Sequence, residues 1–186
     1  MENGREENRQ AAVLIIVRAV GTADPQILLT KRAASLNSHA GEIAFPGGMQ
    51  DPEDRDLLAT ALRETYEEVG LGGDRLAIQA RLNRAYTRQG TAVSPFVAHL
   101  LDETPLKINS HEIEHTFWVP YSFLIADVRL QTDVFVCGGR EFWAPAYEFE
   151  GHLIWGFTSR VLVEFMNCFA GQALVREHAA PEVVRQ

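Results

Sequence analysis

Three glutamates, Glu64, Glu67 and Glu68, lie close together in the chain. Successive residues of an α-helix are rotated by about 100°, so side chains three and four positions apart share one face. In a helix, therefore, these carboxylates would lie on one patch of surface. Such neighbours repel one another and resist ionising together unless a hard cation shares their oxygens. The spacing predicts a site for Mg²⁺ or Mn²⁺, although a solvated acidic helix face is the alternative interpretation.

The residues around the glutamates predict the helix that this arrangement requires. Apolar and small residues recur beside the acidic patch on a stripe that a helix would bury: Leu58, Ala61, Leu62, Thr65 and Val69. Arg63 lies four residues before Glu67, the spacing of a helical ion pair. Gly70 is typical of a helix C-terminus. Either Asp51 or Asp54 is suited to cap the N-terminus.

The string from Gly48 to Leu71 resembles the Nudix box. The matching residues are Gly48, Asp54, Arg63, Glu64, Glu67, Glu68, Gly70 and Leu71. The sequence departs from the pattern in three places: Asp54 replaces a glutamate, one extra residue precedes Arg63, and Thr65 replaces an apolar residue. The resemblance implies a metal-dependent hydrolase of phosphoanhydride bonds. It also implies that Arg63 and the three glutamates are catalytic, with the glutamates and the Gly47 carbonyl in the metal shell.

Residues 28–48, LLTKRAASLNSHAGEIAFPGG, resemble the signature of the coenzyme A pyrophosphatase branch of this family. The matches are Leu28, Leu29, Thr30, Arg32, Gly41, Phe45, Pro46, Gly47 and Gly48. This branch implies hydrolysis of coenzyme A to adenosine 3′,5′-bisphosphate and 4′-phosphopantetheine. Ala33 replaces a serine of the signature and Asn37 replaces an arginine. The substitution at Asn37 favours the alternative substrates ADP-ribose, NADH, a dinucleotide or a nucleoside triphosphate, and a non-catalytic nucleotide sensor is a further alternative.

Candidate substrate-binding residues lie on both sides of the box. Arg32 ends an apolar strand and His39 follows in the next loop, so both can meet ligand phosphates, arginine by bidentate contacts. Tyr86 and Arg88 lie in a polar stretch between two apolar strands. A loop there would cover the substrate, with Tyr86 stacked on a base. A plain connection is the other interpretation of this stretch.

Residues 111–115, HEIEH, match the zinc-protease pattern H-E-x-x-H. That chemistry requires a helix that presents both histidines, whereas the residues that follow predict a short strand ended by Pro120. We therefore interpret the match as coincidental. This stretch is expected to contribute Glu112 or Glu114 to the metal site, and the resemblance favours Glu112 as a base or an additional ligand. A solvated acidic loop is the alternative.

The remaining pattern predicts one catalytic domain over residues 11–172, between a flexible segment 1–10 and a C-terminal tail 173–186 that is expected to fray. Strands are expected at 11–19, 27–32, 75–84, 92–101 and 115–119. A second helix near the end would bury Val161, Leu162, Phe165, Met166 and Phe169. This mixture predicts an α/β fold in which helices sandwich a mixed sheet, and the resemblance implies the Nudix α/β/α sandwich with its loop–helix–loop.

Composition narrows the class of protein further. The chain has 186 residues, 46% hydrophobic and 23% charged, which is typical of a globular protein. A net charge of −8 argues against a nucleic-acid partner. It is compatible with a small nucleotide-containing substrate whose negative charge is neutralised by cations. The absence of a long apolar run and of a signal-peptide core predicts a cytoplasmic protein without a membrane partner. Cys137 and Cys168 are expected to be free thiols, and a homodimer is left open.

Overall fold

The computed structural model describes residues 10–36, 38–103, 105–137 and 140–185. Its contacts divide the chain into two compact units, Met1–Trp118 and Val119–Gln186. The elements of the first unit are β1 (Gln10–Arg18), β2 (Gln26–Arg32), β3 (Ile43–Ala44), β4 (Gly47–Met49), α1 (Leu57–Val69), the 3₁₀ turn η1 (Gly73–Arg75), β5 (Leu76–Arg81), β6 (Ala85–Tyr86), β7 (Ala92–Leu100) and β8 (Ile113–Pro120), which ends just past the boundary. Strands and helices occur together, as the α/β expectation requires.

The first unit is built on a mixed sheet in the order β3-β2-β1-β7-β5, with β4 and β8 on β1 and β2 and with β6 on β7. The strands β1 and β7 run parallel, whereas β1 is antiparallel to β2 and β4. β4 therefore lies beside the first residues of β1 and carries Gly47 and Gly48 into the sheet.

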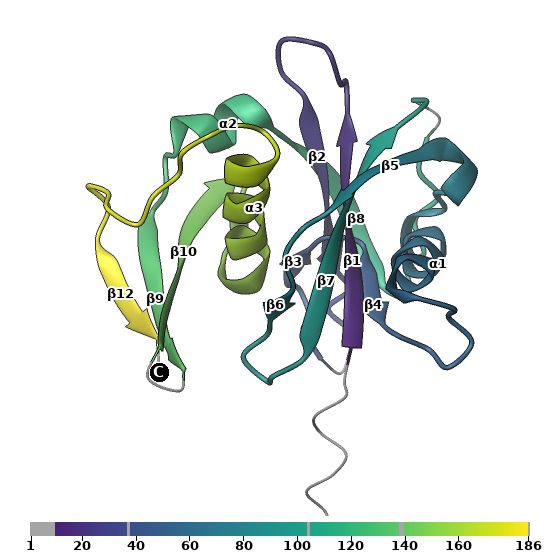
Figure 1. Ribbon diagram of the computed structural model, residues 1–186, viewed down its shortest axis with the longest axis horizontal. Coiled ribbons are helices and arrows are strands. Elements are labelled where there is room, and N and C mark those ends of the chain that lie inside the picture. The colour runs from purple at the N-terminus through teal and green to yellow at the C-terminus, as the bar shows by residue number, and fades with distance from the viewer. Residues whose placement is uncertain (1–9, 37, 104, 138–139, 186) are drawn as a thin grey trace, which may run out of the picture. The chain divides into compact units, whose positions relative to one another are not determined.

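The helix α1 covers one face of this sheet (Figure 1). Its buried side chains Ala61 and Val69 pack with Leu14 and Ile16 of β1 and Phe96 of β7. Burial of a stripe of apolar side chains is the main stabilisation of such a helix, at about 25 cal/mol per Å² of apolar surface. Because this stripe faces the sheet, the adjacent acidic stripe lies at the edge of α1, beside β4.

Both ends of α1 are capped. The N-cap is Asp56, whose Oδ1 accepts a hydrogen bond from the amide of Ala59 at 2.8 Å. The expectation of Asp51 or Asp54 as the N-cap is therefore wrong. The side chain of Asp54 instead accepts hydrogen bonds from Arg63 and Thr60. Gly70 ends the helix at φ 71°, in the left-handed region that favours glycine, as predicted.

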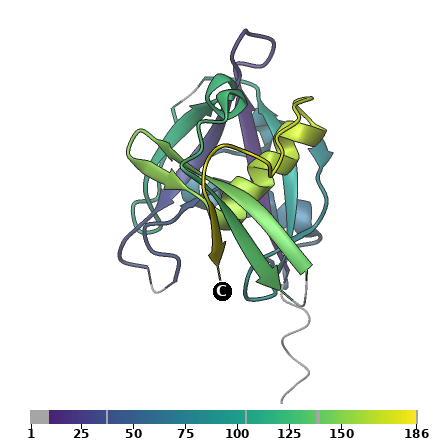
Figure 2. The ribbon, with the colours of Figure 1, turned by 90° about the vertical axis from the view of Figure 1, so that its left-hand side faces the viewer.

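The second unit contains α2 (Tyr121–Ala126), β9 (Gln131–Cys137), β10 (Arg140–Phe149), β11 (His152–Ile154), α3 (Gly156–Cys168) and β12 (Glu182–Arg185). Its strands form a sheet in the order β11-β10-β9-β12, and α3 packs against β10 (Figure 2). Val161, Leu162, Phe165 and Met166 are buried as predicted, but Phe169 follows the last helical turn and is 37% exposed. The segment 173–186, expected to fray, contributes β12, which pairs with β9 in parallel.

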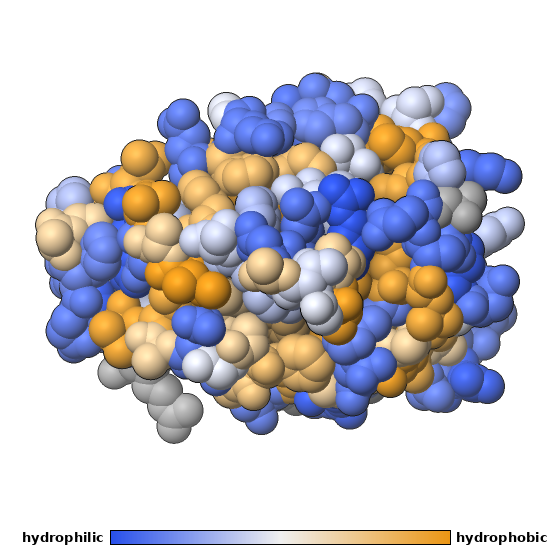
Figure 3. Space-filling view, turned by 90° about the horizontal axis from the view of Figure 1, so that it is seen from above, coloured by the Kyte–Doolittle hydropathy of each residue, from blue (hydrophilic) through white to orange (hydrophobic). Residues whose placement is uncertain are grey.

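The predicted strands near 11–19, 27–32, 75–84, 92–101 and 115–119 correspond to β1, β2, β5, β7 and β8. The short strands β3, β4 and β6 were not predicted, because two or three residues carry no periodic pattern. The antiparallel pair of β9 and β10 was also not predicted. On the face in Figure 3, hydrophobic areas alternate with hydrophilic side chains. Within the described residues, no helix has the length and apolar character needed to span a membrane. Cys168 is a free, exposed thiol, whereas the side chain of Cys137 lies outside the described residues.

Candidate active site

The three glutamates Glu64, Glu67 and Glu68 lie along α1, and their side chains differ in how deeply they are buried. The side chain of Glu68 is 2% exposed, that of Glu64 is 17% exposed and that of Glu67 is 46% exposed. Glu68 is therefore inside the protein, and Glu67 reaches the solvent. The helix thus presents a carboxylate ladder that runs from the interior to the surface, along the edge that faces β4.

The glycines of β4 bring the backbone close to this ladder. The amide of Gly47 donates a hydrogen bond to Oε2 of Glu68 at 3.1 Å. A Cβ atom at Gly48 would lie 2.4 Å from the carboxyl carbon of Glu64. Only glycine leaves room for the Glu64 carboxylate in this position, which explains the glycine at position 48 in physical terms. The predicted place of the Gly47 carbonyl in the metal shell stays a prediction.

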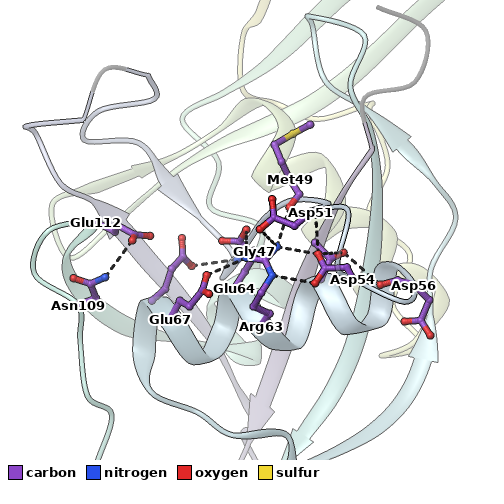
Figure 4. Close-up of polar contacts among 12 residues, drawn as sticks. Gly47, Met49, Asp51, Asp54, Asp56, Arg63, Glu64, Glu67, Asn109 and Glu112 are labelled. Atoms are coloured by element: carbon purple, nitrogen blue, oxygen red, sulfur yellow. Dashed lines mark hydrogen bonds and ion pairs between the residues drawn. The ribbon is translucent and has the colours of Figure 1, made fainter. Parts of the chain in front are cut away.

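Arg63 connects the ladder to the loop that precedes α1 (Figure 4). Its Nη1 donates to Oε1 of Glu64 and to Oε2 of Glu67, both at 3.0 Å, and its Nη2 donates to the Met49 carbonyl at 3.1 Å. Nε and Nη2 also donate to the two oxygens of Asp54. The predicted pair with Glu67 is confirmed. The four other hydrogen bonds, to Glu64, Met49 and Asp54, make Arg63 the residue that fixes where the outer carboxylates point.

The ionisation of the ladder reflects this burial. Burial raises the pKa of Glu68 to about 8, against the opposing hydrogen bond from Gly47 and the charge of Arg32. Burial also raises the pKa of Glu64, which Arg63 lowers in part. Hydrogen bonds from Arg63 hold the pKa of Asp54 well below its usual range. Asp54 therefore stays ionised as a structural partner, whereas the ionised form of Glu68 would be favoured by additional positive charge beside it.

Arg32, at the end of β2, lies beside the buried carboxylate of Glu68. Its Nη1 is 3.5 Å from Oε1 of Glu68. Its Nε is buried and has no hydrogen-bond partner among the described residues. A buried guanidinium donor without a partner costs free energy that an anionic ligand oxygen would recover. The arrangement fits a contact with a phosphate.

Glu112 approaches the ladder from a different part of the chain, on the loop before β8 (Figure 4). Its backbone carbonyl accepts a hydrogen bond from the amide of Ala33 at 2.8 Å, next to Arg32. Its charge is one of the causes that raise the pKa of Glu64 and Glu68. Glu114, the other candidate in this stretch, pairs with Lys31 at 2.9 Å. Of the two candidates, Glu112 is therefore the one that influences the ladder electrostatically, and its role in the site stays a prediction.

The remaining substrate-binding candidates lie in turns or at the end of a short strand. His39 adopts φ 55° in the turn that joins β2 to β3, and its Nδ1 is 2.9 Å from Oε2 of Glu42. Tyr86 is 56% exposed at the end of β6, and Arg88 is exposed in the following turn to β7. The roles of these three residues stay predictions. Asn37, the departure from the branch signature, lies outside the described residues.

The donor set fits a hard divalent cation, because the ladder and Glu112 offer the carboxylate oxygens that such ions prefer. Burial raises the pKa values of Glu64 and Glu68, and a cation beside them would favour their ionised forms. In the structure the counter-charges are Arg63 and Arg32. Among the described residues, no three acidic, histidine or cysteine side chains converge closely enough to hold an ion. To bind a metal ion together, the side chains of Glu64 and Glu67 would have to rotate away from Arg63.

Two features of the site were missed in the sequence. Asp54 was noted as a box position, but its bidentate pair with Arg63 was not predicted. Asn109, which donates a hydrogen bond to Glu112, was not considered. The zinc-protease pattern is excluded as predicted, because Ile113, Glu114 and His115 belong to the strand β8.

Comparison with known proteins is consistent with this geometry. The model of the NUDIX domain matches residues 8–135. The chain is 35% identical over 157 residues to the Uncharacterized Nudix hydrolase NudL of Photorhabdus laumondii, a match that covers 84% of this chain and 83% of that protein. A MutT/nudix family protein from Enterococcus faecalis has a similar structure, with a TM-score of 0.57 at 14% identity over 90% of this chain and 64% of that one. A C. elegans Ap4A hydrolase has a TM-score of 0.52 at 24% identity, over 62% of this chain and 83% of that one.

Proposed function

This chain belongs to the Nudix family of hydrolases, and we propose that it uses Mg²⁺ or Mn²⁺ to hydrolyse the phosphoanhydride bond of coenzyme A or a derivative. The products would be adenosine 3′,5′-bisphosphate and 4′-phosphopantetheine. The observation that supports the reaction is the carboxylate ladder of α1, with the buried Glu68 held by the Gly47 amide. A carboxylate in this position is stabilised when it shares a cation with a diphosphate.

The residues of the ladder and those around it have separate proposed roles. We propose that Glu64, Glu67 and Glu68 hold the cation, which would neutralise the diphosphate and make water more acidic. Arg63 keeps the carboxylates of Glu64 and Glu67 within reach, since it donates to both at 3.0 Å. Glu112 lies close enough to influence Glu64 and Glu68 electrostatically, and its proposed role is to accept the proton of the attacking water.

Arg32 is proposed to contact the departing phosphate. Its buried Nε lacks a partner among the described residues, and the guanidinium lies beside Glu68. A donor aimed at the place where negative charge develops stabilises the transition state more than the bound substrate. In the turn that follows β2, His39 is proposed to contact another phosphate of the same ligand, and Tyr86 and Arg88 are proposed to contact its nucleoside.

The support for coenzyme A comes from residues 28–48, which resemble the signature of that branch. Asn37 is the observation that favours another nucleoside diphosphate derivative, since the branch carries an arginine there. ADP-ribose, NADH and dinucleotides are the alternatives, and a diadenosine polyphosphate is the substrate named for the C. elegans neighbour. A different substrate would leave the roles of the ladder residues unchanged.

The test is turnover of a substrate panel by the purified protein. Coenzyme A, ADP-ribose, NADH, diadenosine polyphosphates and nucleoside triphosphates would be incubated with Mg²⁺ or Mn²⁺, and the products identified by mass. Glu67→Gln should abolish cleavage, because it removes one ligand charge at an exposed position without loss of buried packing. Glu177→Gln, at an exposed position in the second unit, is the matched control and should retain full activity. Cleavage of another compound in place of coenzyme A would refute the proposed substrate. If no compound is cleaved, the proposed hydrolysis itself is refuted.

A further inference from the structure

Asn109 uses its backbone to join the loop before β8 to the end of α1. Its amide donates to the carbonyl of Glu68 at 2.9 Å. Its own carbonyl accepts from the amides of Glu112 at 3.0 Å and Ile113 at 2.9 Å. The loop therefore closes as a tight turn directly over the residue that carries the buried carboxylate. The backbone of Asn109 is committed to the fold whatever side chain it bears.

The side chain of Asn109 has two separate tasks within the same turn. Its Oδ1 accepts a hydrogen bond from the amide of His111 at 3.2 Å, which is the local bond that asparagine commonly makes in turns. Its Nδ2 donates to Oε1 of Glu112 at 3.1 Å (Figure 4). The second bond joins the Asn109 side chain to another side chain, not to the backbone of the turn. It restricts the direction in which the Glu112 carboxylate points.

We propose that Asn109 is the positioning residue for Glu112, and that its amide holds this carboxylate in the orientation for proton transfer. The inference rests on the proposed function, in which Glu112 accepts the proton of water. A carboxylate on a half-buried loop samples several rotamers, and one hydrogen bond from a fixed donor selects among them. The donor is fixed here because the backbone of Asn109 is tied to α1 on one side and to β8 on the other.

The substitution Asn109→Asp separates this role from a structural one. Aspartate keeps an oxygen for the amide of His111, so the turn is retained, but it replaces the donor to Glu112 with a carboxylate that repels it. We expect kcat to fall by about 10- to 100-fold with little change in KM or in melting temperature. Ser110→Ala, at the exposed neighbouring position, is the control and should leave kcat unchanged.

A double-mutant cycle shows whether Asn109 acts through Glu112. In the Glu112→Gln background, Asn109→Asp should cause no further loss of kcat, because the group that it positions is already absent. An equal loss in both backgrounds would overturn the proposal. A normal kcat for Asn109→Asp, when Glu112→Gln is impaired, would also overturn it and would leave the proposed function standing.

A measurement without metal or substrate tests the contact itself. The side-chain amide signals of Asn109 in an NMR spectrum, assigned by their loss in Asn109→Asp, should shift in Glu112→Ala and not in Ser110→Ala. Signals that do not respond to Glu112→Ala would overturn the inference. If the wild-type enzyme hydrolyses no substrate, the proposed function fails first and removes the catalytic part of the inference, while the NMR result still reports on the contact.

Discussion

Asp54 accepts two hydrogen bonds from the guanidinium of Arg63, from Nε to Oδ1 at 3.0 Å and from Nη2 to Oδ2 at 2.9 Å. The Asp54 side chain is 6% exposed, so this pair is largely shielded from water. The same guanidinium reaches Glu64 and Glu67 through Nη1. One arginine thus links the loop before α1 to the outer carboxylates of the site, and a change at Asp54 is expected to reach the proposed metal ligands.

The Arg63–Asp54 pair should contribute to both stability and activity. Arg63→Lys keeps the positive charge but cannot make the bidentate contact, so an oxygen of the buried Asp54 carboxylate loses its hydrogen bond and we expect a loss of about 1–3 kcal/mol in the free energy of unfolding. Cleavage activity should fall as well, since Glu64 and Glu67 lose their shared donor. Urea titration and substrate turnover measure the two effects. Arg55→Lys, whose side chain is 80% exposed, is the control and should change neither.

The space above Gly48 should be essential for the position of Glu64. Gly48→Ala places a methyl group 2.4 Å from the Glu64 carboxyl carbon, so the side chain must move. We expect weaker binding of Mn²⁺ and lower kcat with only a small loss of stability, because the Glu64 carboxylate is the far end of a flexible side chain and can shift. At Gly73 the added methyl would meet Leu62 at an ordinary distance of 3.7 Å. If Gly73→Ala impairs Mn²⁺ binding as much as Gly48→Ala does, this explanation is incorrect.

Two buried threonines of α1 should respond in opposite directions to the same substitution. The hydroxyl of Thr65 is buried and has no hydrogen-bond partner among the described residues, whereas that of Thr60 donates to Asp54 at 2.9 Å. Thr65→Val removes an unsatisfied polar group at constant shape and should stabilise the protein by about 1 kcal/mol. Thr60→Val should destabilise it by about the same amount. Melting temperatures that change in the same direction for both variants would contradict the assignment.

The raised pKa of Glu68 makes the stability of the metal-free protein depend on pH. The folded-state pKa is about 8 against an ordinary value of 4.5, so the folded state binds the proton more tightly than the unfolded state does. The stability from this group is complete below pH 4.5 and is lost as the pH rises through 8. Relative to Glu68→Gln, the free energy of unfolding of the wild type should therefore fall by about 3–5 kcal/mol across this range.

The Glu68 effect is measured by denaturant titration in the presence of a chelator, at several pH values from 4.5 to 8.5. Saturating Mg²⁺ at pH 8 should restore the lost stability in the wild type and have a smaller effect on Glu68→Gln, because the cation favours the ionised carboxylate. Parallel pH profiles for the two proteins would contradict the prediction.

The ladder on α1 was predictable because it depends on local geometry. Glu64, Glu67 and Glu68 lie within little more than one helical turn, and the helical repeat alone places them on one face. The same holds for the pair of Arg63 with Glu67 and for the end of the helix at Gly70. The N-cap was not predictable, since Asp51, Asp54 and Asp56 all have the chemistry for it, and the contact of Asp54 with Arg63 left Asp56 as the cap.

By itself, therefore, the sequence determined the acidic face of α1, its buried stripe, the strands with periodic patterns and the resemblance to the Nudix family. The tertiary structure decided the burial of Glu68, the approach of Arg32 to it and the attachment of Glu112 to the same region through Asn109. Arg32 precedes Glu68 by 36 positions, and the two meet only because β2 and α1 belong to one packed unit. Periodicity reports what neighbouring residues share, whereas contacts over such separations depend on strand pairing and packing, which no local pattern encodes.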